Sequence, residues 1–338
     1  MKKLLKSLFV IALVLSMGIL RTNAQENMFT QYYLNMPGVN AGLTGLEDYL
    51  DLKVGIREGW NNFGVKDNNV YVSAYGALGS SNRSGRRSNS LRVSDPDKFE
   101  RNKAEKEFRR KHAVGGMIYN RRVGPYQSFM INGNYAYHLP ISKKMNLSLG
   151  AKMGYGSQRI NFSGLTVRDD INDVFYQQLI LSQQGNQQSL LIDFGSAIYS
   201  KQFFIGLSTQ NMVVSKLSGD QLLDGNNQKR YMLHSAGTFL LSQNLTMASG
   251  FNLVYAQNYD LAWAVNARVR YKGLIYFGTA YDSNTKISAL LGLTTEKFDL
   301  NYSYDRYLSG LNSFNVSVHE VVVGFPLFNT VGLRPRFW

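Results

Sequence analysis

The chain has 338 residues, with 37 Lys and Arg against 23 Asp and Glu, and it contains 43 aromatic side chains if its 21 Tyr, 19 Phe and 3 Trp are taken together. The complete lack of Cys excludes a disulfide framework and a thiolate metal site. A basic balance alone permits nucleic-acid binding, but the N-terminus predicts export, so lipopolysaccharide or acidic proteins are better candidate partners.

The first 24 residues have the pattern of a signal peptide. Three lysines within the first six residues precede the apolar run 7–20, and small residues at 22–24 supply a cleavage site. The run is too short for a transmembrane helix, which needs about 20 residues. We therefore expect residues 1–24 to be removed and the mature chain to begin at Gln25. No later stretch reaches the ~18 consecutive apolar residues of a spanning helix.

The mature chain alternates between apolar and polar residues at the period of a β-strand. The alternation is clear over 147–155, 261–271 and 298–305, where a helix would scatter charges over its apolar face. Arg268 lies in one of these segments. Because an Arg facing mid-bilayer lipid costs about 2–4 kcal/mol, we expect Arg268 to point into a lumen.

The same pattern recurs fourteen times. The predicted strands lie near 49–57, 69–79, 112–122, 126–138, 146–160, 188–199, 202–211, 231–240, 244–255, 259–271, 274–281, 285–293, 297–306 and 314–325. Joins after even strands are mostly tiny, whereas joins after odd strands include the long segments 161–187 and 212–230, which we expect outside the cell. A soluble β-sandwich, the alternative, has no reason to sort its loops in this way. Residues 49–338 are therefore predicted to form an all-β fold: a single transmembrane antiparallel up-and-down β-barrel of about 14 strands, in the cell outer membrane.

The join after the second predicted strand, residues 80–111, is an exception in length and charge. It holds eleven basic and five acidic residues, a net charge of +6, and by parity it lies in the periplasm. A solvated, flexible insertion is one interpretation. The other is an acidic partner docked on Arg101, Arg109, Arg110 and Lys111.

Residues 25–48 precede the first predicted strand and are aromatic. We expect Phe29, Tyr32 and Tyr33 to tuck against the lumen or its periplasmic mouth; a loose tail or an uncounted strand is the alternative.

Signals for catalysis, cofactors or metals are weak. The four histidines, His112, His138, His234 and His319, lie on separate predicted strands without ligand spacing. Neither a nucleophile elbow nor a phosphate loop occurs. The acidic cluster at 169–173 lacks the central Gly and closing Glu of an EF-hand. We predict no enzyme activity, no cofactor and no metal.

Four short motifs are similar to those of the PorP/SprF family of type IX secretion system outer-membrane proteins. The N-terminal one is Phe29-Thr30-Gln31-Tyr32-Tyr33-Leu34-Asn35 with Asn40-Ala41-Gly42, and the second is Arg57-Glu58-Gly59-Trp60 with Phe63-Gly64. The others are Gly115-Gly116 to Gly124-Pro125 with Tyr135-Ala136-Tyr137-His138-Leu139, and His319-Glu320-Val321 near the end. The chain departs from the family in the length of 80–111 and in the segment that runs on to Phe337-Trp338.

The resemblance implies a non-enzymatic role in type IX secretion of Bacteroidetes-type bacteria. It implies delivery or anchoring of secreted proteins, including gliding adhesins, with other secretion components and cargo proteins as partners. The alternative from another class is a passive porin or solute channel.

Overall fold

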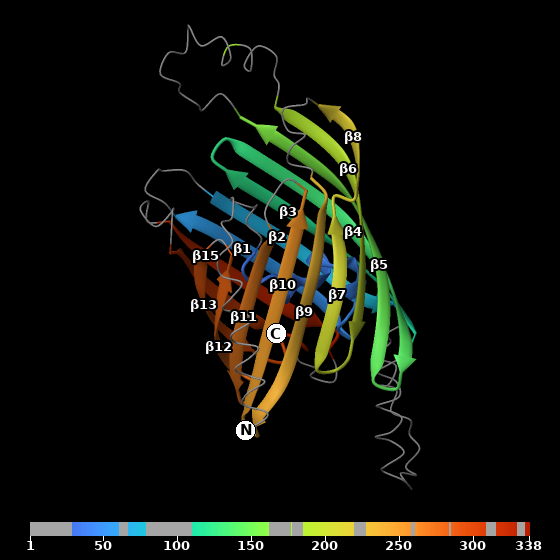
Figure 1. Ribbon diagram of the computed structural model, residues 1–338, viewed down its shortest axis with the longest axis vertical. Helices are drawn as coiled ribbons and strands as arrows, with labels where there is room; N and C mark the ends of the chain where they lie inside the picture. Colours follow the sequence, from blue (N-terminus) through green and yellow to red (C-terminus); the bar gives the residue numbers. More distant parts are fainter. Residues whose placement is uncertain are drawn as a thin grey trace.

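The computed structural model describes residues 29–60, 67–78, 110–161, 177, 185–219, 228–257, 261–283, 285–308, 316–329 and 335–338. Within these residues the chain is mostly β-strand, and the strands surround a lumen (Figure 1). The expected signal peptide and residues 80–109 of the basic insertion lie outside the described residues.

The strands follow one another around the sheet in nearly simple chain order. Their bounds are β1 Leu50–Trp60, β2 Asp67–Leu78, β3 Lys111–Val123, β4 Tyr126–Ser142, β5 Met145–Ile160, β6 Asn186–Tyr199, β7 Phe203–Gln210, β8 Val213–Gly219, β9 Arg230–Ser242, β10 Leu245–Ala256, β11 Ala262–Tyr271, β12 Ile275–Asp282, β13 Lys286–Thr294, β14 Asp299–Tyr307 and β15 Ser317–Leu327.

The sheet is closed, because β1 pairs with β15 and β5 pairs with β6, so that no gap remains in the ring. Every pairing around the ring is antiparallel. Strands β7 and β8 both pair with β6, β7 along its second half and β8 along its first half. They are the two halves of one wall strand, interrupted near Asn211, whose φ of 56° breaks the extended backbone. The wall thus has fourteen strands, as predicted. The short strand β8 was not predicted and falls in the expected loop 212–230.

Side chains alternate between the lumen and the outer face of the wall. Leu300 is 43% exposed whereas Asn301 is 1% exposed, as expected for neighbours on a strand whose side chains point to opposite faces. Arg268 is fully buried against the lumenal Tyr33, so its predicted inward orientation is confirmed. The outer face carries most of the exposed large apolar side chains.

The two ends of the barrel differ. Five tight turns lie at one end, at residues 143–144, 200–202, 243–244, 272–274 and 295–298. All five follow even wall strands, which confirms the predicted parity. The join between β5 and β6 at the other end spans 161–185, although the β3–β4 turn there is short. Short turns mark the periplasmic end of outer-membrane barrels. We therefore call the end with the five tight turns the periplasmic end and the opposite end the outer end.

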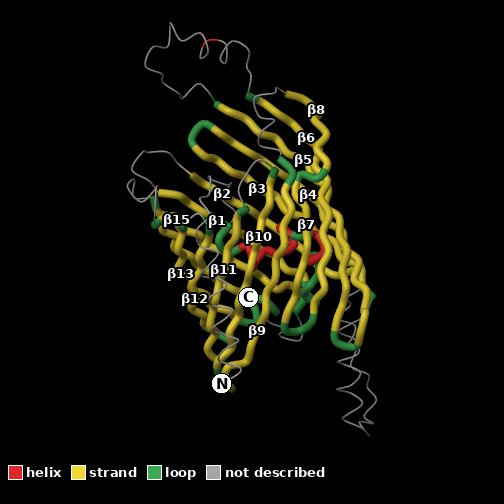
Figure 2. Tube along the Cα trace, in the orientation of Figure 1, coloured by secondary structure: helices red, strands yellow, loops and turns green. Residues whose placement is uncertain are grey.

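Three one-turn helices lie inside the barrel, before β1. They are η1 Tyr32–Asn35, α2 Met36–Val39 and η2 Ala41–Leu43, and Figure 2 shows them enclosed by the strands. In the part of the chain that is described, none of the helices has the length and apolar character needed to cross a membrane.

Candidate functional site

The interior of the barrel is occupied by the segment Phe29–Tyr49, which we call the lumenal segment. Its apolar side chains Tyr33, Leu34, Met36, Leu43 and Leu46 are buried in one cluster with inward-facing wall residues. Its backbone forms short turns: Pro37 lies at the start of α2, and the Asn40 side chain accepts a hydrogen bond from Gly42 N at 2.8 Å, which caps η2. A segment of this compactness fills a lumen that a straight strand would leave open.

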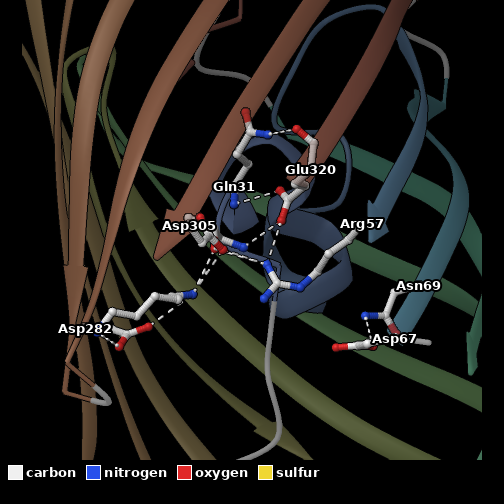
Figure 3. Close-up of polar contacts among 9 residues, drawn as sticks. Gln31, Arg57, Asp67, Asn69, Asp282, Asp305 and Glu320 are labelled. Atoms are coloured by element: carbon white, nitrogen blue, oxygen red, sulfur yellow. Dashed lines mark hydrogen bonds and ion pairs between the residues drawn. The ribbon is translucent and has the colours of Figure 1, made fainter. Parts of the chain in front are cut away.

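The start of the lumenal segment is held by the carboxylate of Glu320. Glu320 on β15 accepts hydrogen bonds from the backbone N–H groups of Thr30, at 2.9 Å, and Gln31, at 3.0 Å. The same carboxylate lies 3.3 Å from Nη1 of Arg57 on β1. Arg57 and Glu320 are direct partners across the β1–β15 pairing, and both side chains are fully buried. Figure 3 shows the Arg57 guanidinium pointing at the carboxylates of Glu320 on β15 and Asp305 on β14.

A second carboxylate and a lysine extend this contact. Asp305 accepts from Arg57 Nη1 at 3.0 Å and from the Thr30 hydroxyl at 2.6 Å. Lys286 donates to the Thr30 Oγ1 at 2.9 Å and lies 3.1 Å from Asp282 and 3.6 Å from Asp305. We call Arg57, Asp282, Lys286, Asp305 and Glu320 the ion cluster. It holds three acids and two bases around Thr30, and such buried ions require each other because unpaired buried charge is strongly destabilising.

The middle of the segment touches the opposite wall through Asn40. Its Nδ2 lies 3.0 Å from the carbonyl of Ser196, 3.3 Å from that of Leu207 and 2.9 Å from Nε2 of His234. The wall residue facing Asn40 is Gly195 on β6, where an added Cβ would lie 2.0 Å from Asn40 Oδ1. The missing side chain lets the segment lie directly against the strands.

The last part of the lumenal segment, which leads into β1, is held at the periplasmic end. His138 Nε2 donates to the Thr44 carbonyl at 2.8 Å, which leaves Nδ1 to accept from the Tyr199 hydroxyl at 2.7 Å. Lys111 Nζ lies 3.1 Å from Asp48. The segment therefore crosses the lumen from the ion cluster to the start of β1.

Residues 335–338 also lie inside the barrel, beside the lumenal segment. The Trp338 ring lies 3.7 Å from the Arg270 guanidinium, and Arg268 lies 3.4 Å from the Tyr33 ring. Such contacts are worth about 2 kcal/mol or more when desolvated. Phe337 packs on Phe204, with ring centroids 5.0 Å apart. The aromatic end of the chain thus packs inside the barrel and not in a wall strand.

Arg336 ties this tail to the lumenal segment. Its backbone N–H donates to Glu47 Oε1 at 2.9 Å, and its Nη2 lies 3.2 Å from Asp48. Burial raises the pKa of the Glu47 carboxyl, and the nearby positive charge of Arg336 opposes that shift.

The predicted motif residues divide between the two faces of the wall. Those in the lumen are Phe29, Thr30, Gln31, Tyr32, Asn35, Arg57, Ala136, His138 and Glu320. Those on the outer face are Trp60, Tyr135, Tyr137 and His319. The ring centroids of Trp60 and His319 are 5.1 Å apart, and the Tyr302 hydroxyl lies 2.8 Å from Nδ1 of His319. The lumenal set is brought together around one segment, and the outer set joins the aromatic surface of the wall.

The four basic residues predicted to bind a partner are not grouped in the described part of the chain. Arg101 and Arg109 lie outside the described residues, and Arg110 is exposed. Lys111 is buried and paired with Asp48, so its side chain is already bound within the barrel.

Asp305, Lys286, Asn40 and Gly195 complete the site but were not predicted as site residues. Asn40 stood within the quoted N-terminal motif, whereas the other three carry no local signal. Space remains beside the lumenal segment, in cavities of ≈ 190 Å³ against β2–β6 and ≈ 80 Å³ against β10–β13. Among the described residues, no three His, Cys, Asp or Glu side chains lie where they could hold one metal ion.

Comparison with known proteins gives one family. The family described as type IX secretion system membrane protein PorP/SprF matches residues 21–325, which include the lumenal segment and nearly all of the wall. No curated protein matches the chain in sequence. Among solved structures, the chain resembles the Pseudomonas putida toluene transporter TodX, with 8% identity and a TM-score of 0.46 over 90% of this chain and 95% of that one. It also resembles the Acinetobacter baumannii outer membrane protein Omp33, with 8% identity and a TM-score of 0.42 over 85% of this chain and 100% of that one.

Proposed function

Because the chain belongs to the PorP/SprF family of type IX secretion system membrane proteins, we propose that it is a plugged outer-membrane barrel that helps to deliver or anchor secreted proteins. Family and fold are those of a membrane component of a secretion system, located in the outer membrane. The finer role, which includes cargo of the gliding-adhesin type and a Bacteroidetes-type host, is our proposal, as is the absence of catalysis.

One observation carries the proposal: the lumenal segment is bonded to opposite sides of the wall. Thr30 and Gln31 bind Glu320 on β15, while Asn40 binds carbonyls on β6 and β7. A passive porin, the alternative function, needs a continuous aqueous path, and this segment lies across it. A barrel whose lumen is filled in this way suits a protein that holds other proteins at the membrane.

Two measurements test the function. A deletion strain should retain cargo with type IX C-terminal signals inside the cell, or release it without surface attachment. The purified full chain should be silent in planar bilayers, and a chain lacking residues 26–46 should conduct. Normal export and attachment of all such cargo, together with steady conductance of the intact chain, would favour the porin.

We also propose that the basic insertion contacts an acidic periplasmic subunit of the secretion machinery through Arg101, Arg109 and Arg110. The insertion follows β2, which ends at the periplasmic end, and its charge attracts acidic surfaces within the ~8 Å screening length of physiological salt. Replacing the three arginines with Gln should leave the barrel heat-modifiable but reduce co-purification of partners, most clearly at raised salt. The matched control replaces Lys143 and Lys144, which lie in an exposed turn at the same end. Equal losses in both variants would show a nonspecific charge effect and refute this contact.

A further inference from the structure

The outer face of the wall carries one continuous polar row near the outer end of β1 to β6. The row follows the strand register from each residue to its direct partner on the next strand. Its members are Glu58, Asn68, Arg122, Gln127, Arg159 and Asn186. Figure 1 shows these six strands side by side.

The row faces away from the lumen. Glu58 and Arg122 are exposed, whereas Arg57, one residue before Glu58, is fully buried inside the barrel. Arg159 and Asn186 are exposed as well, and Gln187 next to Asn186 is buried. Since neighbouring residues of a strand point to opposite faces, the whole row lies on the surface that faces the membrane.

The same register places an apolar row four residues nearer the membrane centre along each strand. Its members are Val54, Val72, Ile118, Ile131, Tyr155 and Leu190. Ile118 and Ile131 are 47% and 44% exposed, as lipid-facing side chains would be. The polar row therefore marks the level at which the apolar band ends and lipid headgroups begin.

Two arginines stand within this row, on β3 and β5, with Gln127 between them. Arg159 Nη2 donates to Gln127 Oε1 at 3.1 Å. Among the described residues, neither Arg122 nor Arg159 has a carboxylate partner. No other Lys or Arg in the described parts of β1–β6 faces outward, because Lys53, Arg57, Lys111 and Lys152 are buried and Arg121 alternates with Arg122. Adjacent strands lie about 4.8 Å apart, so the two Cα atoms are about 10 Å apart, and both long side chains can reach one anion between them.

We infer that Arg122 and Arg159 bind a phosphate group of the acylated outer-leaflet lipid, the lipid A part of lipopolysaccharide. Guanidinium groups form paired hydrogen bonds with phosphate, and basic groups at the headgroup level recognise lipid phosphates. The apolar row below them provides the surface on which the acyl chains of the same molecule lie. A ligand with a phosphate head and several acyl chains fits both features, whereas an acidic protein fits only the first. The inference does not depend on the proposed role in secretion.

The test uses the purified full chain in detergent, with native mass spectrometry to count bound molecules. The probes are diphosphoryl lipid A, lipid A from which both phosphates have been removed, and inorganic phosphate. The variant is R122Q with R159Q, which keeps polar side chains in the row. The control is R306Q, because Arg306 is exposed at the outer end of β14 and its register partners are Ile287 and Ser317.

We expect the double variant to bind diphosphoryl lipid A at least ~10-fold more weakly than the unmodified chain and the control, with each protein heat-modifiable on gels. The unmodified chain should bind dephosphorylated lipid A as weakly as the double variant binds the intact lipid. Equal binding of the intact and dephosphorylated lipids would overturn the inference, and so would unchanged lipid A binding by the double variant. Retention of inorganic phosphate with no preference for the lipid would also overturn it, since the arginines would then bind any anion.

Discussion

Removing Arg57 should loosen the lumenal segment. Arg57 contacts Asp305 at 3.0 Å, Glu320 at 3.3 Å and the Thr30 hydroxyl at 3.3 Å, all buried. In the variant R57M the ion cluster keeps three acids but only Lys286 as a base. Breaking a buried pair by removing one partner costs about 3–5 kcal/mol. Because each 1.4 kcal/mol is tenfold in an equilibrium, the undocked state should gain roughly two to three and a half powers of ten.

The assay is conductance of single barrels in planar bilayers. R57M should show frequent openings where the unmodified chain is silent, and soluble protease should cut the lumenal segment faster. E320Q should have a smaller effect, because it leaves two acids with two bases and retains an oxygen for the Thr30 N–H. The matched control is E58Q, at the exposed position next to Arg57.

The reasoning is refuted by a heat-modifiable R57M barrel that stays as silent and as protease-resistant as the unmodified chain. It is also refuted if E320Q opens the barrel more than R57M does, since the balance of charge in the cluster would then be irrelevant.

Three further predictions concern the wall and the tail. G195A places a methyl group where Asn40 lies and should increase proteolysis of the lumenal segment, while G133A, whose added Cβ meets nothing nearer than 4.0 Å, should behave as the unmodified chain. V265R puts an arginine on the lipid face and should destabilise the barrel by about 2–4 kcal/mol, which would lower the yield of heat-modifiable protein. A264R, on the same face of β11 as the buried Asn266 and Arg268, should assemble; equal yields would contradict the facing assignment. W338A removes a buried aromatic ring, so the midpoint of heat modification should fall, consistent with about 3–5 kcal/mol for loss of such a side chain; an unchanged midpoint would show that the tail does not hold the interior.

The wall could be predicted from the sequence because lipid imposes a period of two on every spanning strand. Arg268 shows how far this extends: its charge alone required an inward position, and it lies against Tyr33. Strand β8 was missed because the break at Asn211 ends the alternation of β7, the strand predicted at 202–211, and leaves a separate piece of only 7 residues after it. The contacts inside the lumen could not be predicted from the sequence either. Thr30 and Asp305 are 275 residues apart, and a single sequence gives no signal for such a pair.

The division of the motif residues, in contrast, follows from parity. Arg57 and Trp60 are three residues apart on β1, and His319 and Glu320 are neighbours on β15, so the members of each pair must face opposite sides of the wall. Once Arg57 is placed inside, a register with Glu320 puts both charges in the lumen and leaves the aromatic side chains for the membrane. The same rule separates Ala136 and His138 from the two tyrosines beside them.

The position of the ion cluster links the lumenal segment to closure of the barrel. Arg57 belongs to the first wall strand and Glu320 to the last, and they are direct partners in the pairing that closes the ring. Glu320 binds the segment through two backbone N–H groups, and Arg57 neutralises that carboxylate only when the two strands meet. The complete binding site for Thr30 and Gln31 therefore exists only in the closed barrel. Since the segment continues directly into β1, its docking in turn holds the first strand against the last. Loss of the lumenal segment should consequently weaken the closing seam as well as open the lumen.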